Sequence, residues 1–241
     1  MKPFLYTDLE RHGKRHWWHL AKRETVGALI MRFWKKGKPI LLDIGCATGI
    51  NLAFFSKFSV ASGIDKSALA IKMCRKKALR NVKVATAEKT GFRDQSFEVL
   101  TMLDILEHTE DEEAIKEAHR ILKKRGLVVA TVPALNFIWS KWDKTLGHKR
   151  RYSRSSLISL FETNDFKILF ITYMYSFLLI PLILIRSVKT RFPVRKYGSD
   201  FNINNPVLNK IGLMLARLER WFVLRKLVPF GTSMAVVARK E

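Results

Sequence analysis

The amino-acid sequence predicts an α/β protein with a doubly wound, mostly parallel sheet. From residue 40 to about residue 132, short apolar runs that suit buried strands alternate with segments of helical periodicity. Two glycines, Gly45 and Gly49, follow the first apolar run, and an acid, Asp65, ends the second. Such alternation implies helices on both faces of a parallel sheet and ligand sites at the carboxyl ends of its strands.

A helical segment precedes the first strand, at about residues 8–37. Apolar residues recur in it at helical spacing, namely Val26, Leu29, Ile30, Phe33 and Trp34. Gly37 and Pro39 then end the helical pattern. We therefore expect residues 1–39 to form an N-terminal helical lid.

Five strands and three helices are expected in the alternating part of the chain. The strands lie at residues 40–44, 60–64, 82–85, 97–103 and 127–132, and the helices at about 50–58, 67–79 and 111–123. Acids at 111–113 and bases at 123–125 suit the two ends of the last helix dipole, and Gly126 would close that helix.

Two more strands are expected after a loop of polar and aromatic residues. Ser153 or Ser155 can cap a helix that runs to Glu162. Residues 166–175 and 233–239 then have strand patterns, and we expect them to pair antiparallel as the last two strands of seven. The sheet domain would comprise residues 40–175 together with 231–241.

Residues 176–230 form an insertion before the last strand, and we expect it to be helical. An apolar stretch at 176–185 is followed by the bases Arg186, Lys189, Arg191, Arg195 and Lys196. Residues 207–228 are then amphipathic, with one apolar stripe that comprises Leu208, Ile211, Met214, Leu215, Leu218, Trp221 and Phe222. A segment of this length is rarely a loop without a function.

Two interpretations of the insertion stay open. The uncharged residues 168–185 approach the length of a membrane span, but Pro181 interrupts them and their first half is needed as a strand. A helical hairpin that dips into one leaflet, with Lys and Arg at anionic headgroups, fits the pattern better. The alternative is a cap over a substrate pocket or a dimer interface, and the oligomeric state is not predicted.

The net charge of +23 lies mainly in the two ends of the chain. Residues 1–39 carry about +7, residues 40–138 about +3 and residues 139–241 about +13. This distribution indicates an anionic partner near the flanks, whereas a merely lysine-rich surface would spread the excess evenly. The chain has only two cysteines, and its N-terminus lacks a signal-peptide pattern, so we expect a cytoplasmic protein. The apolar and basic insertion predicts that it is peripheral at the inner face of the membrane.

The residues around the glycine turn predict a pocket for an adenosyl ligand. Asp43 directly precedes the turn, and its carboxylate would repel a pyrophosphate but suit the ammonium and sulfonium groups of S-adenosyl-L-methionine. Asp65 can accept both hydroxyls of a ribose. Cys46 would contribute its backbone rather than a thiolate. The alternative is an ordinary α/β turn with two acids that cap helices.

Five motifs carry a family resemblance: Leu42-Asp-Ile-Gly-Cys-Ala-Thr-Gly49, Gly63-Ile-Asp65, Gly91-Phe-Arg-Asp-Gln-Ser-Phe97, Leu106-Glu-His108 and Ile121-Leu-Lys-Lys-Arg-Gly126. They resemble the class I S-adenosylmethionine-dependent methyltransferases, in the branch of the ubiquinone-pathway enzymes. The segments 16–18, 147–152 and 229–233 look like a subgroup linked to lipid or cell-surface glycan pathways. The resemblance covers about residues 15–175 and implies a seven-stranded, Rossmann-like methyltransferase sheet.

The resemblance also implies a set of cofactor contacts. They are Arg23 for the carboxylate, Gly45 and Gly49 for the methionine and ribose, Asp65 for the ribose hydroxyls, Thr86, Ala87 and Glu88 for the adenine, and Leu103 and Asp104 for the methionine portion. Lys66, next to Asp65, is also expected to bind the cofactor. Thr86 stands where the family usually has an aspartate, and its hydroxyl would bind the adenine amino group more weakly.

Asp104, Glu107 and His108 form a motif with three open interpretations. A similar motif in ubiquinone-pathway O-methyltransferases is implicated in metal binding. His108 would otherwise act as a base or face the substrate, or the motif would only hold a loop. No metal is assigned here, and His108 and His148 are the candidate bases.

Arg150, Arg151 and Tyr152 follow His148 on the edge of the sheet that carries the predicted pocket. Two guanidinium groups beside a phenol suit a phosphate or carboxylate on a substrate. A basic loop that contacts headgroups or solvent is the alternative.

The sequence as a whole predicts an S-adenosylmethionine-dependent methyltransferase that acts on an amphiphilic substrate at a membrane surface. A lipid-linked, quinone-like or glycolipid substrate would fit. An RNA methyltransferase is the first alternative because of the charge, although no RNA-binding module and no Asn/Asp-Pro-Pro-aromatic motif is found. A non-catalytic, cofactor-binding membrane scaffold is the second.

Overall fold

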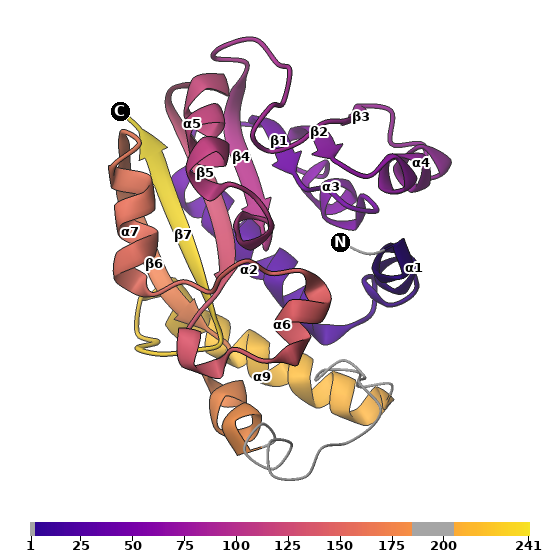
Figure 1. Ribbon diagram of the computed structural model, residues 1–241, viewed down its shortest axis with the longest axis vertical. Coiled ribbons are helices and arrows are strands. Elements are labelled where there is room, and N and C mark those ends of the chain that lie inside the picture. The colour runs from indigo at the N-terminus through magenta and orange to yellow at the C-terminus, as the bar shows by residue number, and fades with distance from the viewer. Residues whose placement is uncertain (1–2, 185–204) are drawn as a thin grey trace.

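A computed structural model describes residues 3–184 and 205–241, which form one seven-stranded sheet with helices on both faces (Figure 1). The strands are β1 Ile40–Ile44, β2 Val60–Asp65, β3 Val82–Val84, β4 Phe97–Leu103, β5 Leu122–Pro133, β6 Phe166–Met174 and β7 Ser233–Lys240. Their order is β3-β2-β1-β4-β5-β7-β6, and β7 pairs antiparallel with both of its neighbours. The predicted fold class and the antiparallel final pair are confirmed.

The described α-helices are α1 Pro3–His12, α2 Trp17–Phe33, α3 Ile50–Phe55, α4 Ala68–Lys76, α5 Asp111–Ile121, α6 Lys141–Leu146, α7 Arg154–Glu162 and α9 Pro206–Leu224. Short 3-10 turns occur at η1 Leu106–His108, η2 Asn136–Ile138 and η3 Ser176–Leu178, and residues 179–184 are also helical. The predicted N-terminal helical segment is therefore two helices. The break falls before His16, whose side chain accepts a hydrogen bond from the Trp18 backbone and so begins a second helix.

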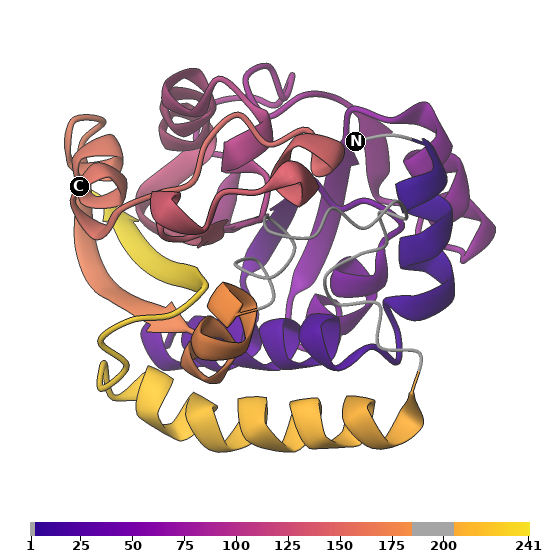
Figure 2. The same cartoon turned by 60° about the horizontal axis from the view of Figure 1, so that its bottom comes forward.

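The two faces of the sheet are covered by different helices. Leu42 and Ile44 of β1 pack with α5 and α7, whereas Leu41 between them packs with α2 and α3 on the opposite face. Helix α9 lies beside α2 on that second face (Figure 2). Because both faces are buried, the central strands can be apolar almost throughout.

The boundary between α5 and β5 differs from the prediction. Helix α5 ends at Ile121, and Lys123, Lys124, Arg125 and Gly126 belong to β5 instead of ending the helix. Leu122 already has an extended backbone and pairs with Phe97 of β4, and the Lys123 ammonium group binds the Glu98 carboxylate at 3.2 Å. Pairing with β4 thus outweighs the small gain from bases at a helix end.

The large apolar side chains of α9 point away from the protein. The inner side of this helix carries Gly212, Ala216 and Val223, and a Cβ on Gly212 would lie 2.9 Å from the Trp17 ring. The outer side carries the whole predicted stripe, whose side chains are 37–60% exposed: Leu208, Ile211, Met214, Leu215, Leu218, Trp221 and Phe222. Small residues therefore bring α9 close to α2, and the large ones remain in contact with solvent.

The part of the insertion between residues 185 and 204, with its predicted bases Arg186, Lys189, Arg191, Arg195 and Lys196, lies outside the described residues. Of the helices that are described, none combines the length and the apolar character that crossing a bilayer requires.

Candidate cofactor site

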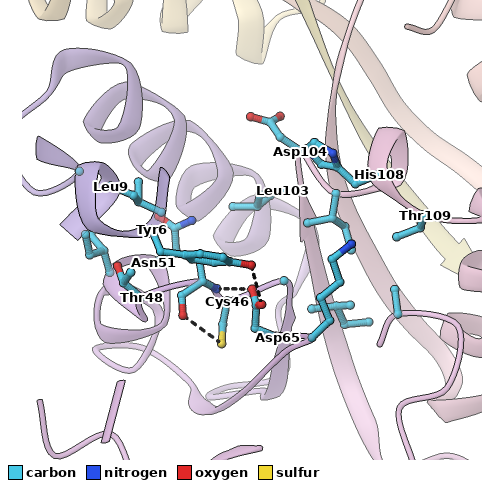
Figure 3. A pocket seen from close by; sticks show the side chains of 18 of the residues that line it. Tyr6, Leu9, Cys46, Thr48, Asn51, Asp65, Leu103, Asp104, His108 and Thr109 are labelled. Atoms are coloured by element: carbon cyan, nitrogen blue, oxygen red, sulfur yellow. Dashed lines mark hydrogen bonds between the residues drawn. The ribbon is translucent and has the colours of Figure 1, made fainter. Parts of the chain in front are cut away.

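A cavity of about 230 Å³ lies at the carboxyl ends of β1, β2 and β4, with α1 and α2 on its other side (Figure 3). Ten of the predicted cofactor residues line it, namely Arg23, Gly45, Cys46, Asp65, Lys66, Thr86, Ala87, Glu88, Leu103 and Asp104. This is the edge where ligands bind in open α/β sheets. The fold brings these residues together as the sequence predicts, and their contact with a cofactor stays a prediction.

Asp65, at the end of β2, is oriented by backbone hydrogen bonds. Its Oδ2 accepts from the Ala47 amide at 3.0 Å, and its Oδ1 accepts from the Ser67 amide at 2.8 Å. The Tyr6 hydroxyl of α1 also donates to Oδ1, at 3.1 Å, and burial together with this carboxylate raises the pKa of Tyr6 (Figure 3). A ribose hydroxyl would therefore find a fixed acceptor, and Tyr6 would compete for one oxygen.

The glycine turn contributes to the cavity through Gly45 rather than through Gly49. Both glycines have a φ of +79°, which favours glycine. At Gly45 a Cβ would lie 2.3 Å from the Ile105 side chain. At Gly49, which caps α3 and does not line the cavity, it would lie 2.4 Å from Leu79. Gly49 is thus explained by packing under the turn.

Asp43 is buried below the turn and does not line the cavity. Its Oδ1 accepts a hydrogen bond from Thr101 at 2.6 Å, and Oδ2 has no partner among the described residues. Burial raises the pKa of Asp43 to about 7, although Thr101 opposes this. Direct contact with a ligand is therefore not supported here, and any influence of Asp43 on a cation would act through space.

Asp104, at the end of β4, has a positive φ of 52° and an ionic partner. The Lys22 ammonium group of α2 donates to its Oδ2, and Thr131 donates to Oδ1 at 2.7 Å. Burial opposes ionisation, but Lys22 and Thr131 outweigh it and hold the pKa of Asp104 below its usual value. The carboxylate is therefore already paired before any ligand binds.

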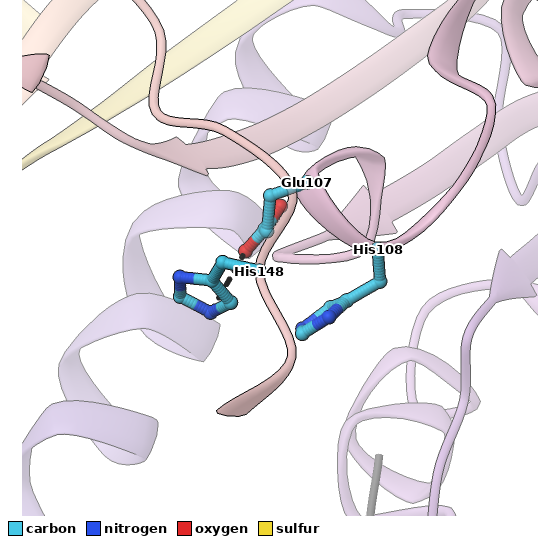
Figure 4. A group of neighbouring side chains, drawn as sticks. All are labelled: Glu107, His108 and His148. Atoms are coloured by element: carbon cyan, nitrogen blue, oxygen red, sulfur yellow. Dashed lines mark ion pairs between the residues drawn. The ribbon is translucent and has the colours of Figure 1, made fainter. Parts of the chain in front are cut away.

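His108 lines the cavity, and His148 lies beside it (Figure 4). Their rings are 4.8 Å apart, and Nε2 of His148 is 3.9 Å from the Glu107 carboxylate. Burial and the neighbouring His148 lower the pKa of His108 to about 4. Burial and Asp104 raise the pKa of Glu107 well above its usual value. His108 is thus neutral at physiological pH, as a base must be before it accepts a proton.

The predicted substrate-binding residues are engaged within the protein. Arg151 is buried and donates to the Asp143 carboxylate at 2.8 Å and to the Ala134 carbonyl at 3.0 Å. Arg150 and the buried Tyr152 both reach Asp111, at 3.2 and 2.6 Å. This geometry favours a role for Arg151 and Tyr152 in holding the loop, and none of the three lines the cavity.

Tyr6, Leu9 and Lys22 line the cavity although no motif marks them. Tyr6 and Leu9 are three residues apart and share one face of α1, a pattern that also suits an ordinary buried helix. Lys22 directly precedes the predicted Arg23, whose guanidinium donates to the Gly13 carbonyl at 3.2 Å. The sequence signal for Lys22 is a base on the helix before β1 that can form an ion pair with an acid at a strand end, here Asp104.

Comparison with known proteins agrees with this architecture. Residues 42–130 match the family of the methyltransferase domain. An uncharacterised protein of Methanocaldococcus jannaschii is 31% identical over 139 residues, which are 57% of this chain and 51% of that protein. The chain thus spans about half the length of this curated relative.

Solved structures show the same fold at low sequence identity. An S-adenosylmethionine-dependent methyltransferase from Thermotoga maritima matches with a TM-score of 0.60 and 20% identity, over 98% of this chain and 95% of that one. A chain from the complex of the Trm112 methyltransferase activator of Haloferax volcanii with a methyltransferase matches with a TM-score of 0.63 and 16% identity, over 98% and 94%. Residues 42–130 therefore match the methyltransferase domain, and the chain has the fold of S-adenosylmethionine-dependent methyltransferases.

Proposed function

We propose that the protein transfers the methyl group of S-adenosylmethionine to an amphiphilic acceptor at the inner face of a membrane. A lipid-linked, quinone-like or glycolipid acceptor has the required chemistry, in line with the resemblance to the ubiquinone-pathway branch. The observation that carries the proposal is the exposed apolar stripe of α9. Soluble proteins rarely leave so many neighbouring large apolar side chains in water.

The surroundings of this stripe support a lipid surface rather than a second protein. Ile180 and Leu184, in the helical segment that precedes the undescribed part of the insertion, are 69% and 61% exposed. Exposed bases lie on or just after α9, among them Lys210, Arg225 and Lys226. Apolar side chains with Trp and Phe, flanked by bases, suit the boundary between anionic headgroups and acyl chains.

In this proposal the three parts of the chain have different roles. Residues 1–39 act as a lid over the cofactor, and residues 40–175 with 231–241 hold it. Residues 176–230 hold the protein at the membrane or cap the substrate. The contact of α1 with Asp65 through Tyr6 supports the lid, and Glu219 of α9, which accepts from the Tyr175 and Ser176 amides at 2.6 Å, ties the insertion to the end of β6.

The reaction is an in-line displacement at the sulfonium methyl group. The protein contributes mainly by holding the acceptor, the methyl carbon and the sulfur in line and by excluding water. An oxygen acceptor must lose a proton, and His108 with His148 beside it is the group at the cavity that supports this step.

Radiolabelled S-adenosylmethionine with total lipid, glycan and RNA fractions tests the function directly. We expect the purified protein to label the lipid fraction. The Asp65→Ala variant, which loses the predicted ribose acceptor, serves as the control. Label in the RNA fraction would replace the proposal with the alternative that the charge of +23 favours. If the protein binds the cofactor but labels no fraction, the result would support the second alternative, a non-catalytic scaffold.

The membrane contact is tested by flotation of the protein with vesicles that contain anionic lipid. The double variant Leu218→Ser/Trp221→Ser should float at least about tenfold less than wild type, because burial of each such side chain contributes about 1.5–3 kcal/mol. Phe137→Ser is the matched control, since Phe137 is 69% exposed but lies in η2, away from α9. If both variants lose flotation equally, or if neither loses it, the apolar stripe of α9 is not the membrane contact.

A further inference from the structure

Two buried thiols come together beneath the glycine turn. Cys46, in the turn, and Cys74, on α4, are the only cysteines of the chain, and both are unpaired. Cys46 lines the cofactor cavity, whereas Cys74 does not. Both belong to one apolar cluster, with Leu52, Ile71 and Val82. A single buried cysteine commonly serves only as a small apolar side chain, but here two different elements bring their thiols to one place.

Both thiols point at the same backbone carbonyl. The Ala47 carbonyl oxygen lies 3.2 Å from Sγ of Cys74 and 4.0 Å from Sγ of Cys46 (Figure 3). Hydrogen bonding between the two sulfur groups raises the pKa of Cys46 and lowers the pKa of Cys74. Cys74 is therefore the more easily ionised of the two, and the ionised sulfur is the form that attacks an oxidised partner.

The residue that accepts from both thiols also orients Asp65. The Ala47 amide donates to the Asp65 carboxylate at 3.0 Å, and Ala47 has a φ of +47°, a conformation that alanine adopts only when its neighbours hold it there. The next carbonyl, of Thr48, accepts from the Lys77 ammonium group at 2.5 Å. A change in the bonds of the Ala47 carbonyl would therefore shift the residue that fixes the proposed ribose acceptor.

The packing around the two sulfur atoms is tight. A Cβ on Gly63 of β2 would lie 2.9 Å from Sγ of Cys46, and a Cβ on Gly49 would lie 2.9 Å from Sγ of Cys74. A covalent bond brings two sulfur atoms much closer together than a hydrogen bond does. Because β2 is paired with β1 on one side and with β3 on the other, we expect the turn rather than the sheet to move when such a bond forms.

We propose that Cys46 and Cys74 form an oxidation site, and that a disulfide between them weakens ligand binding in the cofactor cavity. The oxidant is hydrogen peroxide, which reaches Cys46 through the cavity. The Cys46 sulfur attacks one peroxide oxygen, the O–O bond breaks, and a sulfenic acid and water result. The Cys74 sulfur then attacks the sulfenic sulfur, and the S–O bond breaks with release of a second water. Two thiols and one peroxide thus give one disulfide and two waters.

The effect on the ligand rests on the proposed function, whereas formation of the disulfide does not. Oxidation removes both S–H groups from the Ala47 carbonyl and draws Cys46 toward α4. The Ala47 amide then moves away from the Asp65 carboxylate, which loses part of its fixed orientation. A ligand that fills the cavity would in turn cover Cys46 and slow its oxidation.

Treatment of the reduced full chain with hydrogen peroxide tests the disulfide without any ligand. The chain is then denatured and alkylated with N-ethylmaleimide. We expect label on both cysteines before oxidation and on neither afterwards, and dithiothreitol should restore both thiols. Peptide mapping should find Cys46 linked to Cys74 within one chain. A chain that keeps both thiols, that forms disulfides only between chains, or that carries only sulfinic acid at Cys46 overturns the proposal.

Calorimetry with S-adenosylhomocysteine measures the effect on the cavity. The oxidised chain should bind at least about tenfold more weakly than the reduced chain, because Asp65 loses a hydrogen bond that orients its charge. Dithiothreitol should restore the affinity. Cys74→Ser keeps a hydroxyl group for the Ala47 carbonyl but cannot form the disulfide, so its affinity should be the same before and after peroxide. This variant also controls for oxidation of methionine.

Circular dichroism reports whether Cys74→Ser folds, and Cys74→Ala replaces it if it does not. A disulfide that leaves the affinity unchanged contradicts the effect on the cavity. An equal loss of affinity in the peroxide-treated variant assigns that loss to other oxidised residues and contradicts it as well. If the reduced wild type does not bind S-adenosylhomocysteine, the proposed function fails, and peptide mapping still decides whether Cys46 and Cys74 are an oxidation site.

Discussion

Replacement of Asp65 by alanine is expected to weaken the binding of S-adenosylhomocysteine by about 100-fold. The carboxylate is fixed by the Ala47 and Ser67 amides at the end of β2, so it can accept the ribose hydroxyls without rearrangement. A hydrogen bond to a charged group contributes about 1.5–3 kcal/mol, and the loss of two such bonds corresponds to at least this factor. Isothermal titration calorimetry measures the change.

Two controls separate this effect from damage to the fold. Asp94→Ala removes an acid whose side chain is 71% exposed and lies outside the cavity, and it should bind the ligand as wild type does. Tyr6→Phe removes the hydroxyl that competes for Asp65 but keeps the carboxylate, so it should not weaken binding. If Asp65→Ala folds and binds as tightly as wild type, the ribose assignment is wrong.

The positions of the strands were predictable because each strand is marked locally. The apolar runs at 40–44, 60–65 and 97–103 lie between turn residues. A buried strand of this kind can be located from its own residues, without knowledge of the contacts that it makes with distant parts of the chain. The boundary at Leu122 was not predictable in the same way. Three bases suit a helix end, but Leu122 pairs with Phe97, and only the sheet itself reveals that competing contact.

The residues of the candidate site also differ in how far the sequence predicts their positions. Asp65 and Gly45 follow strand ends, so topology alone brings them to one edge. Tyr6 and Leu9 come from α1, whose position depends on how that helix crosses the edge, and their spacing in the sequence carries no sign of it. Asp43 stands in the expected motif, yet its side chain turns toward Thr101 inside the sheet. A motif identifies a position in the chain, and packing decides the direction of its side chain.

The Asp43→Asn variant is expected to be more stable than wild type at pH 8, by about 4 kcal/mol. Asp43 is buried, one of its oxygens has no partner among the described residues, and its pKa is raised to about 7 in the folded protein. Ionisation at pH 8 therefore costs folding free energy that a neutral amide of the same shape avoids. Urea unfolding followed by circular dichroism measures the difference.

The pH dependence distinguishes this cause from a general packing effect. Because the folded-state pKa lies above the unfolded value of about 3.9, the contribution of Asp43 to stability is complete below about pH 4 and is lost as the pH rises through 7. The advantage of Asp43→Asn should thus be near zero at pH 4 and grow toward pH 8. An advantage that does not change with pH would assign the effect to packing instead.

The buried carboxylate of Asp43 lowers the free energy of unfolding, so we expect it to serve the function of the protein. The gain would be attraction of the sulfonium charge through the floor of the cavity. S-adenosylmethionine carries this charge and S-adenosylhomocysteine does not, so Asp43→Asn should weaken binding of the first ligand more than binding of the second. Equal weakening of the two would show that Asp43 acts on the glycine turn alone, and the sulfonium would then depend on Asp104 and other groups that line the cavity.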